Sequence, residues 1–313
     1  MATTRTAGQP GNGLAPAYRM YFVEVSHTQR LSPSFVRITF TGSCLRAFGA
    51  SGTDQRIKLL LPQPGRPVTD IPSGHRWHAA WQAMASRIRP IMRSYTVRAH
   101  RPDTGELDID FVLHGADGRG GPVSAWALTT RPGDRVALAG PDPAGAGRRW
   151  GCAWSPPSTA RLLVIAGDET AVPAVASIVE ALPADARGVV CVEVPAPDDR
   201  QCWTAPDGVE VRWLVRRCAA GSAPHGSLLE PTVAQVLAEL GTPAAGTDLA
   251  EMDVDTSILW DVPDVSTGQG EFYAWLAGEA GVIKRLRRLM VNDHGVPRTS
   301  VAFMGYWRQG HSG

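Results

Sequence analysis

The feature that most constrains this chain is a change of hydrophobic rhythm near its middle. Up to about residue 140, the apolar segments are short, rich in β-branched and aromatic residues, and bounded by turn formers. Beyond residue 160, nearly continuous apolar runs alternate with segments of helical spacing. The first pattern is typical of antiparallel strands and the second of an α/β sheet. We therefore expect two domains of different architecture.

The first half predicts a β-barrel. Strands are expected at residues 21–26, 35–41, 56–61, 93–99, 106–113 and 134–139. In the fifth of these, apolar residues at 107, 109, 111 and 113 alternate with aspartates at 108 and 110, which is the period of a strand with one buried face. Six short strands without long helices between them predict a six-stranded antiparallel barrel. One short helix is expected at 122–128, and residues 62–90 form a long insertion.

The second half predicts a doubly wound α/β domain. Strands are expected at 161–166, 188–194, 209–215, 272–277 and 300–306, and helices at 169–182, 230–240 and 279–292. The run RLLVIA at 161–166 is apolar almost throughout, as in a parallel strand buried on both faces. Such domains bind ligands beyond the carboxyl ends of their strands. The stretch 241–270, rich in Gly, Thr, Asp and Pro, is expected to be mostly loop.

The Gly- and Pro-dense segment 141–157 marks the boundary between the two halves. We place a loose polar tail at residues 1–17, the barrel domain at 18–145 and the α/β domain at 158–313. The tail contains no apolar core of a signal peptide.

Composition excludes several classes of function. The net charge of +1 points neither to nucleic acid nor to an acidic membrane as a partner. No segment approaches the ~18–20 apolar residues of a membrane span. The five cysteines include no Cys-x-x-Cys pair, so we expect neither a disulfide framework nor a metal site, and free thiols fit a reducing cytosol. We expect a cytoplasmic protein, with a monomer as the default state.

The strand RSYTVR at 93–98 is the first candidate site. A flavin requires a flat wall for its ring, a hydrogen-bonding group near its reactive nitrogen, and cations for its pyrophosphate. Tyr95, Thr96 and Arg93 supply these three types close together, with 93, 95 and 97 on one face and Ser94 and Thr96 on the other. The same residues would also fit an ordinary barrel strand with surface arginines.

A second candidate is the segment His114-Gly115 followed by Gly121-Pro122-Val123-Ser124. Glycine before a helix start exposes backbone N–H groups to an anion, and proline suits the first helical turn. Two interpretations of His114 are equally good, a contact to the ligand and a histidine that simply ends a strand.

A third and a fourth candidate follow two strands of the α/β domain. The turn GDETAVP at 167–173 includes Asp168, Glu169, Thr170 and Ala171, at the place where dinucleotide folds bind their ligand. It lacks the G-x-G-x-x-G fingerprint, and helix capping explains much of the pattern. Glu279, in the turn after the strand FYAWLA, is read as a cleft residue or as an acid facing the helix dipole.

The order of these motifs resembles the siderophore-interacting protein family, FAD-containing ferric-siderophore reductases of the ferredoxin-reductase-like superfamily. The matching pieces are RSYTVR at 93–98, DIDFVLHG at 108–115, GPVSAWA at 121–127, PGD at 132–134, GDETAVPA at 167–174, WLAGEAG at 275–281 and GYWRQG at 305–310. Together they span most of the chain after the insertion.

The resemblance implies FAD on the barrel domain, and NADPH or NADH as hydride donor on the α/β domain. It implies electron transfer through the flavin to a ferric siderophore or other small-molecule acceptor, with release of Fe(II). Catalytic roles then fall to Thr96, Tyr95, Asp168 and Glu279. The implied cofactor-binding residues are Arg93, Ser94, Tyr95, Thr96, Val97, Asp110, Val112, His114, Gly121, Pro122, Val123, Ser124, Asp168, Thr170 and Ala171.

Some functional questions stay open on the sequence. A 2′-phosphate of NADPH would find Arg212, Arg216 or Arg217 on or after the third α/β strand, yet no residue marks NADH or NADPH preference. The acceptor could instead be a non-iron compound of a biosynthetic pathway. A binding protein that holds siderophore or flavin without turnover is a third reading, disfavoured by the intact turns at Asp168 and Glu279.

Overall fold

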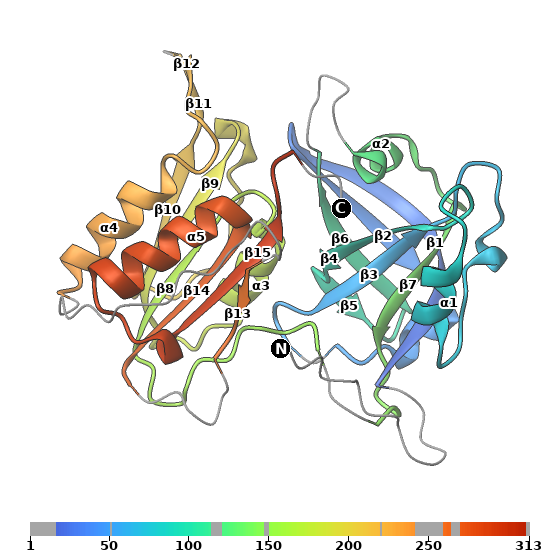
Figure 1. Cartoon of the computed structure of the whole chain (residues 1–313), viewed down its shortest axis with the longest axis horizontal. Helices are drawn as coiled ribbons and strands as arrows, with labels where there is room; N and C mark the ends of the chain where they lie inside the picture. Colours follow the sequence, from blue (N-terminus) through green and yellow to red (C-terminus); the bar gives the residue numbers. More distant parts are fainter. Residues whose placement is uncertain are drawn as a thin grey trace, which may run out of the picture.

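The computed structural model describes residues 17–50, 52–113, 121–146, 150–219, 221–241, 259–263 and 270–310. They form a seven-stranded antiparallel sheet and a six-stranded, mostly parallel sheet that lie side by side (Figure 1). The last strand of the first sheet ends at Pro141 and the first strand of the second begins at Leu162.

The first sheet has the order β4-β3-β7-β1-β2-β6-β5. Its strands are β1 (Tyr18–Ser32), β2 (Phe35–Thr41), β3 (Arg56–Leu61), β4 (Ile91–Thr96), β5 (Ala99–Arg101), β6 (Glu106–Val112) and β7 (Arg135–Pro141). The sheet curls, but the expected closed six-stranded barrel is not confirmed: among the described residues no ladder joins β4 to β5 or β6. The two ends meet where Arg98 N donates to Asp108 O at 2.9 Å and Tyr95 packs on Phe111. Packing and a backbone hydrogen bond, rather than a ladder, therefore bring the two ends together beside β4.

The curled sheet encloses an apolar core formed by alternate residues of its strands. Leu107, Ile109 and Phe111 of β6 point into this core, as their period of two predicts. Helix α2 (Pro122–Thr129) covers one end of it through Val123 and Ala127.

The 62–90 insertion covers part of the outside of the sheet. Its short helix α1 (Trp77–Ala83) packs Trp77 on Leu60, Ala137 and Ala139. The insertion therefore buries an outer face that would otherwise meet water.

The second sheet has the order β10-β9-β8-β14-β15-β13, parallel except for β13. Its strands are β8 (Leu162–Gly167), β9 (Arg187–Val194), β10 (Val209–Val215), β13 (Trp260–Asp261), β14 (Phe272–Glu279) and β15 (Val301–Trp307). Helix α3 (Val172–Glu180) packs on one face, and α4 (Leu229–Glu239) and α5 (Ala280–Arg288) pack on the other. The doubly wound prediction is confirmed, although β13 interrupts the stretch expected as loop. A hairpin of β11 (Arg217–Cys218) and β12 (Gly221–Ser222) follows β10.

Specific polar contacts hold the two sheets together. Asp199, in the 3-10 turn after β9, accepts hydrogen bonds from Ser32 Oγ (2.6 Å), Ser34 N (2.9 Å) and Ser34 Oγ (2.8 Å) at the β1–β2 turn. Asp54 accepts hydrogen bonds from the backbone N–H groups of Ala153 and Trp154. Both aspartates are fully buried, so these contacts are shielded from competing water.

None of the helices in the described residues is long and apolar enough to cross a membrane.

Candidate active site

Strand β4 lies at one end of the curled sheet and directs alternate side chains to its two faces. Tyr95 turns toward the sheet interior, where its ring lies 4.5 Å from that of Phe111. Burial raises the pKa of the Tyr95 phenol, which therefore stays neutral. Thr96 lies on the opposite face and is 6% exposed, and its hydroxyl has no hydrogen-bond partner among the described residues. This pairing of an aromatic wall with an uncommitted hydroxyl matches what a flavin ring requires.

The cationic end of β4 is also available to a ligand. Arg93 Nη1 donates to Met92 O at 2.8 Å, and the guanidinium has no other bond within the described part of the chain. Lys58, opposite Ser94 in the β3–β4 ladder, donates to Ser94 Oγ at 2.7 Å. Burial and then the neighbouring Arg56 lower the pKa of Lys58.

The start of α2 fits an anion. Gly121 precedes the helix, no side chain caps it, and open space surrounds the position where a Cβ would stand. The backbone N–H groups of Val123 and Ser124 have no acceptor in the helix itself, because no residue of the helix precedes them by a full turn. An anionic group placed there would meet both N–H groups and the positive end of the helix dipole.

Several residues expected around the cofactor are committed elsewhere. The Asp110 carboxylate is buried and accepts two hydrogen bonds from Arg37. Ser124 Oγ donates to Val112 O, and the Val97 side chain lies in the apolar core. Such residues can reach a cofactor through their backbone alone. His114 lies outside the described residues.

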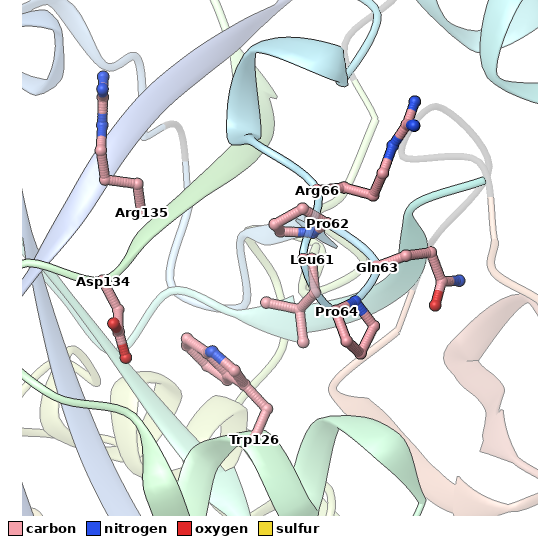
Figure 2. Close-up of a pocket in the computed structure, with 9 residues that line it drawn as sticks. Leu61, Pro62, Gln63, Pro64, Arg66, Trp126, Asp134 and Arg135 are labelled. Carbon is pink, nitrogen blue, oxygen red and sulfur yellow. The ribbon is translucent and has the colours of Figure 1, made fainter. Parts of the chain in front are cut away.

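A hollow of 260 Å³ lies beside α2. Figure 2 shows Leu61 and Trp126 pointing into it, with Arg66 and Arg135 on either side; the full lining is Leu61, Pro62, Gln63, Pro64, Gly65, Arg66, Trp126, Asp134 and Arg135. Trp126 also stacks on Phe40 and contacts Phe111 edge-on, so its ring packs against the core of the first sheet. The hollow offers an aromatic wall about one helical turn from the anion site.

In the α/β domain, Asp168 joins the carboxyl ends of three strands. Its Oδ1 accepts hydrogen bonds from Thr170 N (2.9 Å) and Thr170 Oγ1 (2.5 Å). Its Oδ2 accepts from Glu279 N (2.8 Å) and Trp307 Nε1 (2.9 Å). The residue is 1% exposed, so the carboxylate organises the ends of β8, β14 and β15 rather than offering a free oxygen.

Glycine is required where β14 passes this carboxylate. A Cβ on Gly278 would lie 2.7 Å from Asp168 Oδ2, closer than real Cβ contacts allow. Glu279, the next residue, caps α5 by accepting from Val282 N at 2.9 Å, and it also accepts from Gln309 N at 3.2 Å. Capping therefore accounts for much of the Gly-Glu pattern.

Two other members of the 167–173 turn differ in their exposure. Ala171 is fully buried beneath α3, so its side chain faces the core. Thr170 is partly exposed. No side chain caps the start of helix α3, so neither Asp168 nor Thr170 has the capping role that the sequence pattern suggested.

A buried charge network lies next to Asp168. Arg216 donates to both oxygens of Glu169 at 2.8 Å and to Glu193 Oε1 at 3.0 Å. His225 Nε2 lies 3.3 Å from Asp168 Oδ2 and 3.6 Å from Glu169 Oε2. Burial by itself would raise the pKa of Glu169, but His225 and Arg216 outweigh it and lower that pKa to about 2.

Asp168, Glu169 and His225 lie close enough together to ligate a cation. However, the Arg216 guanidinium already occupies both Glu169 oxygens, and Trp307 and Glu279 N already bond Asp168 Oδ2. The protein's own cations neutralise this site, and we assign no metal to it.

The sequence analysis did not identify Glu193, His225 or Asp199, the buried residue that bonds the β1–β2 turn. A buried acid at the end of an apolar strand, as in GVVCVEV, is the one signal that could have indicated Glu193. Neither His225 nor Asp199 stands in a recognisable pattern, and both gain their partners through tertiary contacts.

A curled antiparallel sheet joined to a mostly parallel α/β sheet is the fold of the ferredoxin reductases. A ferredoxin-NADP+ reductase of Neisseria gonorrhoeae, solved with FAD and NADP, shares this fold with a TM-score of 0.55 and 13% identity over 92% of this chain and 99% of that chain.

The chain belongs to the siderophore-interacting protein family. Residues 24–145 match the siderophore-interacting FAD-binding domain, and residues 160–310 match the siderophore-interacting protein model. The protein is therefore a flavoprotein with an FAD-binding domain.

Relatives and solved structures agree with this assignment. An uncharacterised protein of Mycobacterium tuberculosis is 32% identical over 94% of this chain and 92% of its own length. Ferric vibriobactin reductase ViuB of Vibrio cholerae is 27% identical (90% and 86%), as is an NADPH-dependent ferric-chelate reductase of Escherichia coli (90% and 91%). The siderophore-interacting protein SipS of Aeromonas hydrophila matches with a TM-score of 0.63 and 31% identity over 95% of this chain and 94% of that chain.

Proposed function

We propose that this protein is an FAD-dependent reductase that takes hydride from NAD(P)H and delivers electrons to the iron of a ferric siderophore, releasing Fe(II). One observation carries the proposal. Arg56 of β3, the ladder partner of Thr96, contacts Met304 Sδ of β15 at 3.8 Å, so the strand paired with the proposed flavin strand adjoins the α/β sheet. The ferric reductases among the relatives support the choice of acceptor.

The chain's own residues would bind and orient the two cofactors. Thr96 Oγ1 would hydrogen-bond near the reactive flavin nitrogen, and Tyr95 would flank the ring. Arg93 and the N–H groups at the start of α2 would hold the pyrophosphate. Bound FAD would supply the redox chemistry, accepting a hydride and releasing electrons one at a time.

The acceptor would dock on the outer face of β3 and β4. Lys58 stands there opposite Ser94, which is exposed. This cation beside the flavin strand would attract an anionic ferric chelate.

The donor preference is proposed to depend on Arg217. Among the three arginines considered, Arg212 is bonded to Glu210 and Glu239, and Arg216 is buried against Glu169. Arg217 is exposed on β11, and its side chain has no partner among the described residues. It would bind the 2′-phosphate of NADPH at the carboxyl edge of the sheet.

Anaerobic spectroscopy of the FAD-loaded protein tests this function. NADPH or NADH should bleach the flavin bands, and a ferric siderophore should restore them while Fe(II) appears in a chelator trap. Bleaching that is reversed by quinones or nitro compounds but not by ferric chelates would replace iron with another acceptor. A flavin that neither nucleotide bleaches would identify a binding protein without turnover.

We further propose a monomer in the cytoplasm, with the FAD-binding domain at 18–145 and the NAD(P)H-binding domain at 158–313. Light scattering of the purified protein checks the oligomeric state.

A further inference from the structure

His225 has an unusual position for a residue on a connecting segment. It follows the β11–β12 hairpin and reaches back to the carboxyl edge of the parallel sheet, where its side chain is 15% exposed. Backbone bonds fix the segment around it, because Glu193 accepts from Gly226 N (2.6 Å) and Leu228 N (3.1 Å). The imidazole is therefore held in place rather than free to swing into water.

The imidazole contacts residues at the carboxyl ends of β8 and β15. Its Nε2 faces Asp168 and Glu169 at 3.3 and 3.6 Å, and its ring meets the Trp307 ring edge-on with centroids 5.1 Å apart. Trp307 in turn donates to Asp168 Oδ2. His225, Asp168 and Trp307 thus form a closed triangle at the ends of β8 and β15.

The surrounding charges favour a protonated imidazole. Asp168 and Glu169 face it from the turn after β8, Glu193 lies at the end of β9, and Arg216 pairs with Glu169 and Glu193. Burial by itself would lower the pKa of His225, but Asp168 and Glu169 outweigh it and raise that pKa to about 10. Glu279 reaches the triangle through its backbone N–H, and its carboxylate is bonded to Val282 and Gln309.

We propose that His225, as an imidazolium, is a positioning residue that holds Asp168 and Trp307 in the geometry required for hydride transfer. The inference rests on the proposed function, because it assumes that the nicotinamide meets the flavin at the end of the sheet where β8 and β14 diverge. At this switch point a doubly wound sheet binds its ligand, and Trp307 and Thr170 border it. His225 acts through Asp168 and Trp307 and touches neither substrate nor flavin.

Loss of the imidazolium has a defined consequence. The Asp168–Glu169 pair would lose the positive charge that faces it, and Trp307 would lose the ring packed against it. A small displacement at a hydride-transfer site costs much rate, because the reacting atoms need close alignment. Donor binding far from this point should change little.

The test compares the FAD-loaded wild type with His225→Gln and with His78→Gln, whose parent histidine is exposed on α1. Stopped-flow reduction of the flavin by NADPH is followed from about pH 7 to pH 10.5, together with reoxidation of photoreduced flavin by a ferric chelate. In His225→Gln the limiting reduction rate should fall by about tenfold or more, with a smaller change in the donor's apparent Kd. The wild-type rate should decline as pH passes through 10, the variant should lack that decline, and reoxidation should stay within about twofold. His78→Gln should match the wild type.

Nitrogen-15 NMR of labelled histidines and the Trp307 indole N–H resonance, assigned with Trp307→Phe, provide a readout independent of turnover. His225 should remain an imidazolium at about pH 8, and the Trp307 resonance should shift in His225→Gln. A His225 that titrates near its ordinary 6.5, an unmoved Trp307 resonance, or a His225→Gln reduction rate equal to the wild type would overturn the proposal. If no nucleotide reduces the wild-type flavin, the proposed function fails and the NMR result alone decides whether His225 positions Trp307.

Discussion

The contact made by Asp199 gives the sharpest prediction about how the two sheets are held together. Its Oδ1 accepts from Ser32 Oγ and Ser34 N, and its Oδ2 accepts from Ser34 Oγ and Ala196 N. Asp199→Ala would leave these donors facing an apolar void. A hydrogen bond to a charged group contributes about 1.5–3 kcal/mol, but bonds that share one carboxylate do not add. Each buried donor left without an acceptor costs about 1–3 kcal/mol, so with four such donors we expect a total loss of about 3 kcal/mol or more.

The matched control is Glu180→Gln, which removes the partly exposed ion pair between Glu180 and Arg98 of the other sheet. That variant should lose less than about 1 kcal/mol. Asp199→Asn should lose an intermediate amount of stability. Its amide oxygen can still accept from one pair of donors, but its NH2 group would face the other pair, which would then lack an acceptor. Urea unfolding, followed by tryptophan fluorescence and circular dichroism, measures all three. Equal and small losses of unfolding free energy in Asp199→Ala and Glu180→Gln would refute the role of Asp199 in holding the two sheets together.

Three further predictions concern the site. Arg93→Ala should lower the FAD content of the purified protein, whereas unchanged flavin occupancy would remove Arg93 from the pyrophosphate site. Arg217→Ala should raise the KM for NADPH and leave that for NADH unchanged, and equal effects on both donors would contradict the 2′-phosphate assignment. Because the pKa of Glu169 is lowered from 4.5 to about 2 in the folded protein, its contribution of about 3 kcal/mol is present above pH 4.5 and is lost as pH falls toward 2. Glu169→Gln should flatten that acid limb in unfolding experiments, and an unchanged slope would show that the carboxylate is unpaired.

The pH dependence at the alkaline end has the opposite sign. The folded-state pKa of His225 is raised from 6.5 to about 10, so its stabilising effect is complete below pH 6.5. The free energy of unfolding should then fall by up to about 1.4 kcal/mol per pH unit between 6.5 and 10. His225→Gln should remove this slope in denaturant titrations.

Most secondary structure could be predicted from the sequence because each element carries its own periodicity. Alternation at Leu107, Ile109 and Phe111 identified a strand with one buried face, and the structure places all three in the core. The apolar run at 161–166 identified a buried parallel strand, which is β8. Closure of the first sheet could not be predicted in the same way, since it depends on how β4 and β6 approach each other and not on the pattern within either strand.

Candidate site residues could be grouped from the sequence where they are neighbours in the chain. Arg93, Tyr95 and Thr96 lie on one strand, and Gly121 and Pro122 begin one helix, so local geometry suffices to group them. Tertiary structure changed the interpretation of Asp168, because Trp307 Nε1 and Glu279 N donate to its Oδ2 from segments more than a hundred residues away. Asp110 changed for the same reason, being bonded to Arg37 of a neighbouring strand.

The sequence by itself determined the division into an antiparallel β half and an α/β half and the family resemblance, and it predicted which strand holds the flavin, because all three depend on short-range patterns of residue type. Only the tertiary structure decided which charges neutralise one another. Glu169, Glu193, Arg216 and His225 come from four separate segments, and they meet because parallel strands end at a common edge. Burial at that edge removes the water that would otherwise screen each charge, so the network's protonation and geometry depend on the assembled fold.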